Sequence, residues 1–357
     1  MKNDTRSGSI RSSLILILTA LIWGSSFVGQ RAGMEFIGPF LFIALRMALG
    51  SATLVLVLLL ASLVMRSRRT KKLEPTVPKE ALDKEKALDK EKTLDRKGFL
   101  GALMQDPSSE VVSTRGLRGK RLIIAGIFCG LVLFCSSAFQ QVGIIDVDAG
   151  KAGFLTTLYI VLVPILGIVL KHKTHWNTWV AVVIAAFGLY FLCMQTGLRI
   201  ELGDLMVLLG AFGWACHILA IDHFVAGASP RDVLRLCAAQ FAVSALLGLI
   251  CSLLFDGLFP RGAFDFQALL GALPSVLFVG ILSTGVAFTL QAVGQQGLNP
   301  TTASLIMSLE AVFAVLTGML ILHEALSGRE ILGCALMLGA FVLSQLSFRN
   351  KSSTAQT

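Results

Sequence analysis

The amino-acid sequence predicts an all-α integral membrane protein with ten transmembrane helices, arranged as two inverted five-helix repeats. Its composition is the first reason: 55% of the 357 residues are hydrophobic and 15% are charged, whereas an average soluble chain has roughly 25% charged residues. The second reason is that apolar runs of the roughly 20 residues needed to cross a bilayer recur along the chain. The third is that the second half repeats residues of the first at constant spacing.

The charged residues are concentrated in one segment. Residues 66–121 hold 16 basic and nine acidic residues, and the other 301 residues hold 28 charges, too few to cover a soluble surface of that size. The net charge of +9 comes mostly from this segment. A charged loop is not a folded basic face, so we expect no nucleic-acid partner. The seven cysteines lie in apolar stretches without CxxC spacing, which predicts no disulfide framework and no zinc site. We expect no other metal and no cofactor.

The apolar runs place the helices in chain order. The first run follows three basic residues but lacks a small-residue cleavage site, so we expect an uncleaved helix rather than a signal peptide. The expected helices span residues 13–30, 40–65, 122–145, 152–170, 176–195, 204–224, 233–255, 268–290, 301–322 and 330–348. The first five belong to a repeat of residues 12–195 and the last five to a repeat of residues 203–348. Residues 349–357 form a tail.

Lysine and arginine predict the orientation. With the N-terminus in the cytoplasm, the connections on the cytoplasmic side hold 25 basic residues and those on the outer side hold four. Cytoplasmic loops carry the excess of basic residues in membrane proteins. The sequence therefore predicts a multi-pass protein of the cell (plasma) membrane, with both termini and residues 66–121 in the cytoplasm.

Residues 66–121 form an insert between the second and third expected helices. A six-residue unit, ALDKEK, occupies residues 81–86 and 87–92 and returns as TLDRKG at 93–98. Six residues turn a helix by about 600°, so successive leucines build no apolar stripe. We expect a disordered or marginally helical segment. Its basic N-terminal flank either contacts membrane lipid or is an ordinary flank that stops membrane transfer.

The two halves of the chain align at two constant offsets. An offset of 151 pairs Leu158 with Leu309, and an offset of 191 pairs Trp23 with Trp214. The difference of 40 residues fits the insert, which has no counterpart of its length in the second half. Because five is odd, the second unit crosses the membrane in the opposite sense. Inverted repeats are typical of secondary transporters, in which the substrate site lies near the midplane at the repeat interface.

Four stretches resemble the drug/metabolite transporter superfamily, in its ten-helix EamA-type branch with two EamA repeats. These stretches are TALIWGSSFV at 19–28, AGFLTTLYIVLVPILGIVL at 152–170, GDLMVLLGAFGWACHILAIDHF at 203–224 and TASLIMSLEAVFAVLTGMLILHE at 302–324. The resemblance covers nearly all of residues 12–348 apart from the insert. It implies a permease, often an exporter, for small metabolites, amino acids or drugs. The long segment at 66–121 departs from the short loop usual in the family.

Charges within the expected helices are the strongest functional candidates, because a charge in hydrocarbon is costly unless it is paired or faces a wet cavity. Glu310 lies about nine residues into the ninth expected helix, roughly 13 Å deep at 1.5 Å per residue. It is either a protonatable group in a cavity or a structural carboxyl that bonds to neighbouring groups. Arg46, in the second expected helix, either contacts a substrate anion or pairs with an internal carboxylate or carbonyl.

Aromatic and polar residues on other helices complete the candidate pathway. Trp214 and His217 share a face of the sixth expected helix, and Trp23 is the repeat counterpart of Trp214. His217 is either a buried, satisfied side chain or a titrating group. Other donors and acceptors either line the pathway or join helices by hydrogen bonds. These residues are Tyr159, Gln140, Gln240, Gln291 and Gln295. Pro164 is expected to kink the fourth helix, because it leaves a backbone carbonyl free.

The sequence thus predicts a secondary transporter, an exporter of a small-molecule substrate that works by alternating access. Glu310 and its repeat counterpart Tyr159 are expected near one another's depth, where Glu310 could exchange protons and couple transport to the proton gradient. The chain lacks the HExxH, GxSxG and GxxxxGKS/T patterns, so we expect neither a membrane enzyme nor an ATP-driven pump. The alternative is a non-transporting scaffold or sensor that docks partners through residues 66–121. The sequence is also compatible with a homodimer and does not specify the oligomeric state.

Overall fold

A computed structural model of the chain describes residues 2–71, 117, 119–147, 149–193, 201–259, 265–322 and 327–346. Every regular element in these residues is helical and none is a strand, so the predicted all-α class is confirmed. Most of the predicted insert at 66–121 and the whole tail at 349–357 lie outside the described residues. The expectations for those two segments therefore stay predictions.

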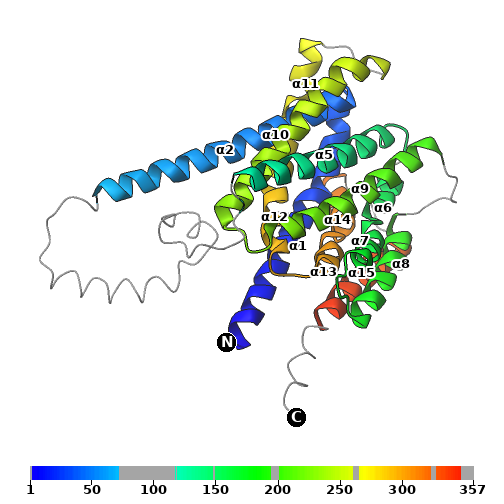
Figure 1. Ribbon diagram of the computed structural model, residues 1–357. Coiled ribbons are helices and arrows are strands. Elements are labelled where there is room, and N and C mark those ends of the chain that lie inside the picture. The colour runs from blue at the N-terminus through cyan, green and yellow to red at the C-terminus, as the bar shows by residue number, and fades with distance from the viewer. Residues whose placement is uncertain are drawn as a thin grey trace, which may run out of the picture.

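The helices of the first half follow the predicted apolar runs (Figure 1). They are α1 (Lys2–Met34), α2 (Pro39–Lys71), α5 (Lys120–Gly143), α6 (Ala149–Thr157), α7 (Tyr159–Val169) and α8 (Trp176–Cys193). Both α1 and α2 are longer than the apolar runs at 13–30 and 40–65, because their basic flanks continue the helix.

The second half follows its predicted runs in the same way. Its elements are α9 (Leu202–Val225), α10 (Pro230–Phe255), the short η1 (Asp256–Leu258), α11 (Phe266–Leu277), the π-helical η2 (Phe278–Ala287), α12 (Phe288–Gln295), α13 (Pro300–Met307), α14 (Glu310–Leu322) and α15 (Gly328–Leu346). Helices α10 and α13 each begin with a proline after a capping residue, Ser229 or Asn299, whose side chain accepts a backbone N–H. This pattern starts helices efficiently.

Eight helical stretches in the described residues are long and apolar enough to cross a membrane. The stretch Trp176–Leu192 of α8 is apolar but shorter, and α15 coincides with the tenth predicted helix. Each of the ten predicted runs is therefore helical over most of its described residues, as a multi-pass membrane protein requires. Membrane crossing by α8 and α15 stays a prediction.

The fourth and ninth predicted helices are each broken in two. A kink was expected at Pro164, but the break lies at Leu158, and α7 continues through Pro164. The ninth helix breaks at Ser308 and Leu309, where there is no proline. At both breaks an amide bonds to a carbonyl three residues earlier, as Val161 does to Leu158, which tightens one turn. A tight turn at repeat-related positions, rather than proline, therefore accounts for both breaks.

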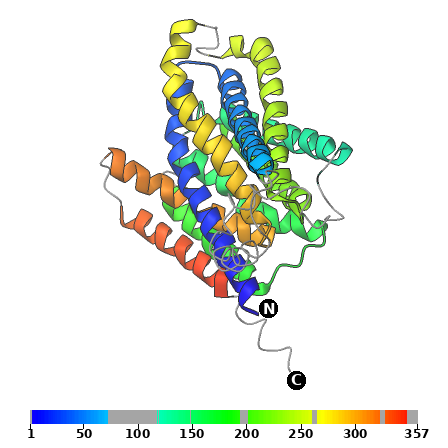
Figure 2. The ribbon, with the colours of Figure 1, turned by 90° about the vertical axis from the view of Figure 1, so that its left-hand side faces the viewer.

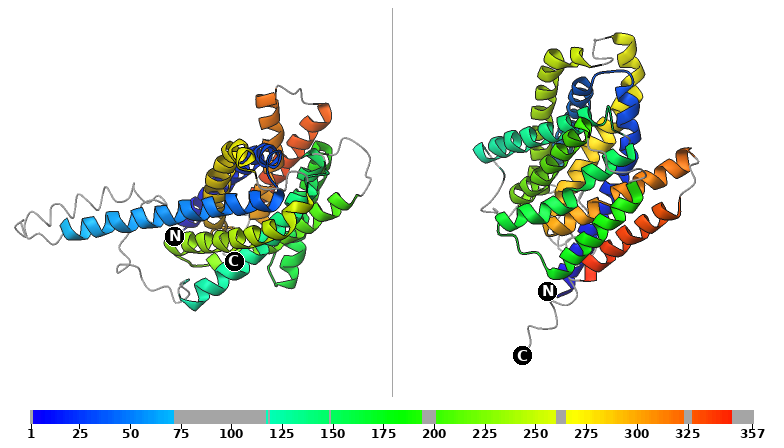
Figure 3. Two further views of the ribbon diagram at one scale, coloured as in Figure 1. Left: turned by 90° about the horizontal axis from the view of Figure 1, so that it is seen from above. Right: turned by 90° about the vertical axis from the view of Figure 1, so that its right-hand side faces the viewer.

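Helices at equivalent positions in the two halves pack against each other. Helix α2 packs along its counterpart α10, and α8 packs along its counterpart α15. Helix α5 packs along α9, which by the sequence offsets is the counterpart of α1. The start of α1 and the end of α15 lie at the same end of the molecule (Figures 1 and 2). Seen from above, the C-terminal part of α2 extends beyond the other helices (Figure 3). Leu56, Leu59, Leu60 and Leu63 are exposed there, which fits contact with lipid.

Two large apolar clusters make up the core. One is formed mainly by α1, α7, α8, α9, α13, α14 and α15, and the other mainly by α2, α5, α9, α10 and α12. Trp23 of α1 and Trp214 of α9 pack against both clusters. The space between the two tryptophans is therefore where the two clusters meet.

Candidate functional site

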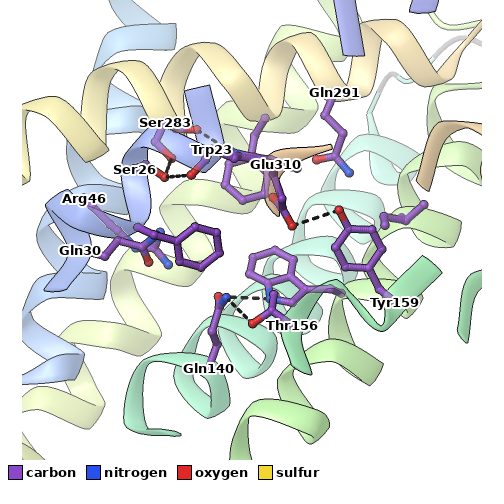
Figure 4. Close-up of a pocket in the computed structure, with 14 residues that line it drawn as sticks. Trp23, Ser26, Gln30, Arg46, Gln140, Thr156, Tyr159, Ser283, Gln291 and Glu310 are labelled. Carbon is purple, nitrogen blue, oxygen red and sulfur yellow. Dashed lines mark hydrogen bonds between the residues drawn. The ribbon is translucent and has the colours of Figure 1, made fainter. Parts of the chain in front are cut away.

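A cavity of about 50 Å³ lies between the two apolar clusters, several times the volume that one water molecule needs. Figure 4 shows its polar side chains, which come from both halves of the chain. The cavity is lined by Trp23, Ser26, Phe27, Gln30, Arg46, Gln140, Thr156, Tyr159, Trp214, Ile218, Ser283, Phe288, Gln291 and Glu310.

The structure brings together seven of the ten residues that the sequence singled out. These seven are Glu310, Arg46, Tyr159, Trp23, Trp214, Gln291 and Gln140. The other three do not line the cavity. Gln295 Nε2 donates a hydrogen bond of 3.0 Å to the Ile218 carbonyl oxygen, and the remaining two are His217 and Gln240. They bond to each other, with His217 Nε2 and Gln240 Oε1 2.9 Å apart. The His217 ring packs edge-on against Trp214 and Phe288, so the pair lies behind an aromatic wall.

Glu310 and Tyr159 meet across the cavity. Each is the first residue of the helix that follows a break, Tyr159 in α7 and Glu310 in α14. The Tyr159 hydroxyl donates a hydrogen bond of 3.1 Å to Glu310 Oε1, and both side chains are buried. A Cβ at Gly24 would lie 2.5 Å from the Glu310 carbonyl oxygen, so only glycine lets α1 approach α14 this closely. The Tyr159 hydroxyl and the close approach of α1 thus hold the carboxyl group in a fixed place.

Gln140 is held at both ends of its amide. Its Oε1 accepts a hydrogen bond from Trp214 Nε1 at 3.2 Å, and its Nε2 donates to Thr156 Oγ1 at 3.1 Å (Figure 4). Gln291 lies 151 positions further along the chain and also lines the cavity, but its buried Oε1 has no hydrogen-bond partner among the described residues. One amide of the pair is therefore occupied and the other offers a free acceptor.

Trp23 is held by the π-helical segment η2. Its Nε1 donates to the Ser283 carbonyl oxygen at 3.3 Å. The Ser283 hydroxyl donates to Ser26 Oγ at 3.1 Å, and Ser26 in turn donates to the Trp23 carbonyl oxygen at 2.9 Å. A π-helical turn is wider than an α-helical one and recurs at functional sites. Here it presents a main-chain carbonyl to a cavity tryptophan.

Arg46 is almost fully buried, with 3% of its surface exposed. Neither its Nε nor its Nη2 has a hydrogen-bond partner in the part of the chain that the structure describes. One of the two interpretations of Arg46 was that it pairs with an internal carboxylate or carbonyl. Its Nε and Nη2 have no such partner among the described residues. The guanidinium borders the cavity beside Gln30, whose Oε1 is also buried without a partner (Figure 4).

Several lining residues were not singled out from the sequence. Ser26 and Gln30 follow Trp23 at helical spacing, and Phe288 precedes Gln291 by three residues, so extending each helix face would have found them. Ser283 acts through its main chain and depends on the π-helical turn, for which the sequence gives no signal. The described residues contain no group of three His, Cys, Asp or Glu side chains placed to hold a metal ion.

Residues 201–345 match the EamA-like transporter family. The chain is 30% identical over 223 residues to an uncharacterized transporter of Archaeoglobus fulgidus, covering 62% of this chain and 68% of that protein. It is 25% identical over 348 residues to the uncharacterized transporter YoaV of Bacillus subtilis, covering 96% and 99%. It is also 29% identical over 178 residues to the threonine/homoserine exporter RhtA of Salmonella typhimurium, covering 49% and 57%.

A solved crystal structure has a similar fold. It aligns with 96% of this chain and 99% of its own, with a TM-score of 0.65 and 18% sequence identity. At that identity the likeness concerns the fold alone.

Proposed function

This chain is a membrane transporter of the EamA-like transporter family, and from that premise we propose that it is a secondary transporter that exports a small metabolite by alternating access. The observation that carries the proposal is the cavity at the meeting point of the two halves, with Glu310 in its wall. Transporters with inverted repeats bind substrate at such an interface. The relatives bear the names of transporters rather than enzymes.

Contacts between repeat counterparts support a two-repeat organisation, with residues 12–195 and 203–348 as the units. Tyr159 and Glu310 are 151 positions apart and bond directly. Two groups related by a twofold axis can touch only if they lie close to that axis. Trp23 and Trp214, 191 positions apart, also line the same cavity. The cavity therefore lies where a pseudo-twofold axis would pass, equally related to both repeats.

Glu310 is our candidate for coupling to the proton gradient. Its carboxyl group is buried in the cavity, where it can hold either a proton or a positively charged group of the substrate. If both compete for the carboxylate, substrate leaving the cell exchanges for protons entering it. The name of RhtA makes amino acids the first substrates to test. We place the protein in the plasma membrane with both termini in the cytoplasm.

The test compares Glu310→Gln with Glu35→Gln, a matched change at an exposed glutamate between α1 and α2. Vesicles containing each protein are loaded with a cellular metabolite extract, a pH gradient is imposed, and lost compounds are identified by mass spectrometry. Wild type and Glu35→Gln should deplete the same compounds, whereas Glu310→Gln should deplete none against their gradient. If Glu310→Gln depletes them with unchanged pH dependence, Glu310 is structural. If wild type depletes nothing, the chain is not an exporter of small metabolites.

A further inference from the structure

The buried guanidinium of Arg46 is the least satisfied charged group of the cavity. A buried charge is costly unless a counter-charge or hydrogen bonds compensate it. The described residues give its Nε and Nη2 no partner, and no ion pair with a carboxylate forms there. A group that is buried at this cost and opens onto a cavity points to an anion brought by the ligand.

The unpaired acceptors of the cavity predict the rest of the ligand. Gln291 Oε1 is buried and unpaired in the described structure, and the Glu310 carboxylate, which accepts a bond from Tyr159 at Oε1, has two oxygens that can accept further bonds. In Figure 4 Arg46 lies on one side of the cavity, and Gln291, Glu310 and Tyr159 lie on the other. One free acceptor, Gln30 Oε1, lies beside Arg46, whereas Gln291 Oε1 and the Glu310 carboxylate lie across the cavity from the unpaired donors of Arg46.

We propose that Arg46 is the anion site of this cavity and that the substrate is a small zwitterion, with its carboxylate on Arg46 and its ammonium group at Gln291 and Glu310. This inference rests on the proposed function, because it names the substrate class of the same site. A guanidinium binds a carboxylate through parallel N–H donors. An amide oxygen and a carboxylate are acceptors that suit an ammonium group.

The charges of the cavity wall favour a zwitterionic substrate over a simple anion or a simple cation. The cavity wall carries one basic side chain, Arg46, and one acidic side chain, Glu310. A zwitterion pairs both and leaves the site neutral. A simple organic anion would leave Glu310 without a cation, and a simple cation would leave Arg46 unpaired. The aromatic surfaces of Trp23, Trp214 and Phe288 then enclose the apolar part of the molecule.

Gln140 shows why Gln291 rather than its counterpart receives the ligand. The amide of Gln140 is already bonded at both ends, to Trp214 and Thr156. Its oxygen could bind a ligand only if the hydrogen bond from Trp214 were lost. Gln291 has a free acceptor. The two amides that the repeat places at equivalent positions therefore differ in role.

The first experiment uses vesicles loaded with a cellular metabolite extract and asks which compounds wild type depletes. We expect every depleted compound to carry both a carboxylate and an ammonium group. If depleted compounds lack a carboxylate, the inference is wrong while the proposed transport function stands. If nothing is depleted, the transport function itself fails and the inference fails with it.

The second experiment measures binding of the most depleted compound by the fluorescence of the cavity tryptophans. Two analogues of this compound are measured beside it. The amide analogue lacks the carboxylate, and the α-hydroxy acid analogue lacks the ammonium group. Each should bind at least about tenfold more weakly than the parent compound, since each loses a charge-assisted hydrogen bond. Arg46→Met should bind the parent compound no better than its amide. An Arg46→Met protein that discriminates between acid and amide as wild type does would overturn the proposal.

Thermal unfolding without substrate separates this role from a structural one. Arg31→Met, at an exposed position in the last turn of α1, is the matched control. Removing an unpaired buried charge should leave the melting temperature of Arg46→Met equal to or above that of wild type. A fall in melting temperature for Arg46→Met that Arg31→Met does not share would make Arg46 a structural residue and overturn its assignment as the anion site.

Discussion

At the scale of single residues, the sequence predicts most of the polar and charged side chains of the cavity. It does not predict which hydrogen bonds these side chains form. The charges Arg46 and Glu310 stand out because charged residues are rare in apolar runs, and the two tryptophans stand out by their repeat spacing. His217 was a candidate because it shares a helix face with Trp214, yet its side chain pairs with Gln240 away from the cavity. Periodicity places a residue on a helix face, but which neighbour that face meets depends on tertiary packing.

The two glutamines of the cavity provide a prediction about stability. Gln140→Leu removes the acceptor of Trp214 Nε1 and the donor to Thr156 Oγ1, and each buried group left unpaired costs about 1–3 kcal/mol. Gln291→Leu leaves no partner of its Oε1 unpaired. We therefore expect Gln140→Leu to lower the free energy of unfolding and Gln291→Leu to leave it nearly unchanged, measured by thermal or denaturant unfolding in detergent. Equal losses in the two variants would contradict the difference in role.

At the scale of helices, the sequence predicts where the elements lie better than where they bend. Each of the ten apolar runs is helical over most of its described residues. Helices α10 and α13 start within a few residues of the expected boundaries, at Pro230 and Pro300. The break at Leu158 was expected six residues later, at Pro164. The π-helical segment Phe278–Ala287 has no counterpart in α5, which is α-helical over the equivalent residues. Such local departures depend on the packing of neighbouring helices rather than on residue type.

The start of α2 is capped from the other half of the chain. Asp256, at the end of α10, is buried, and its two carboxylate oxygens accept hydrogen bonds from the Phe40 amide at 3.0 Å and the Leu41 amide at 2.8 Å. A Cβ at Gly38 would lie 2.5 Å from the Asp256 carboxyl carbon. A carboxylate at a helix N-terminus also interacts favourably with the helix dipole.

This cap leads to a prediction with an internal control. Asp256→Asn replaces one accepting oxygen with an NH₂ group that faces a backbone N–H, so it should lower the free energy of unfolding by about 1–2 kcal/mol. Asp265→Asn is the control, because Asp265 is an exposed local cap of α11 and asparagine caps helices about as well as aspartate. Unfolding of both variants in detergent measures the difference. An Asp256→Asn protein as stable as Asp265→Asn would show that the cap contributes little.

At the scale of the whole molecule, the internal repeat predicted from the sequence agrees with how the two halves of the chain pack. The offsets of 151 and 191 residues, read from the sequence, pair residues that meet in space, as Tyr159 and Glu310 do. The packing of α2 on α10 and of α8 on α15 joins equivalent helices in the same way. Sequence offsets do not specify how tightly two such units close around a cavity, and the unpaired state of Arg46 and Gln291 could not be predicted from them.

The remaining prediction concerns orientation. The start of α1 and the end of α15 lie at one end of the molecule (Figure 1). The excess of 25 basic residues over four predicts that this end faces the cytoplasm. A cysteine introduced by Lys90→Cys should therefore resist a membrane-impermeant maleimide in intact cells and react once the membrane is opened. Arg261→Cys, between α10 and α11, should react in intact cells. Unmodified protein gives the background of the seven native cysteines. The reverse pattern, with Lys90→Cys labelled from outside and Arg261→Cys protected, would invert the topology, and the export direction would then need to be assigned anew.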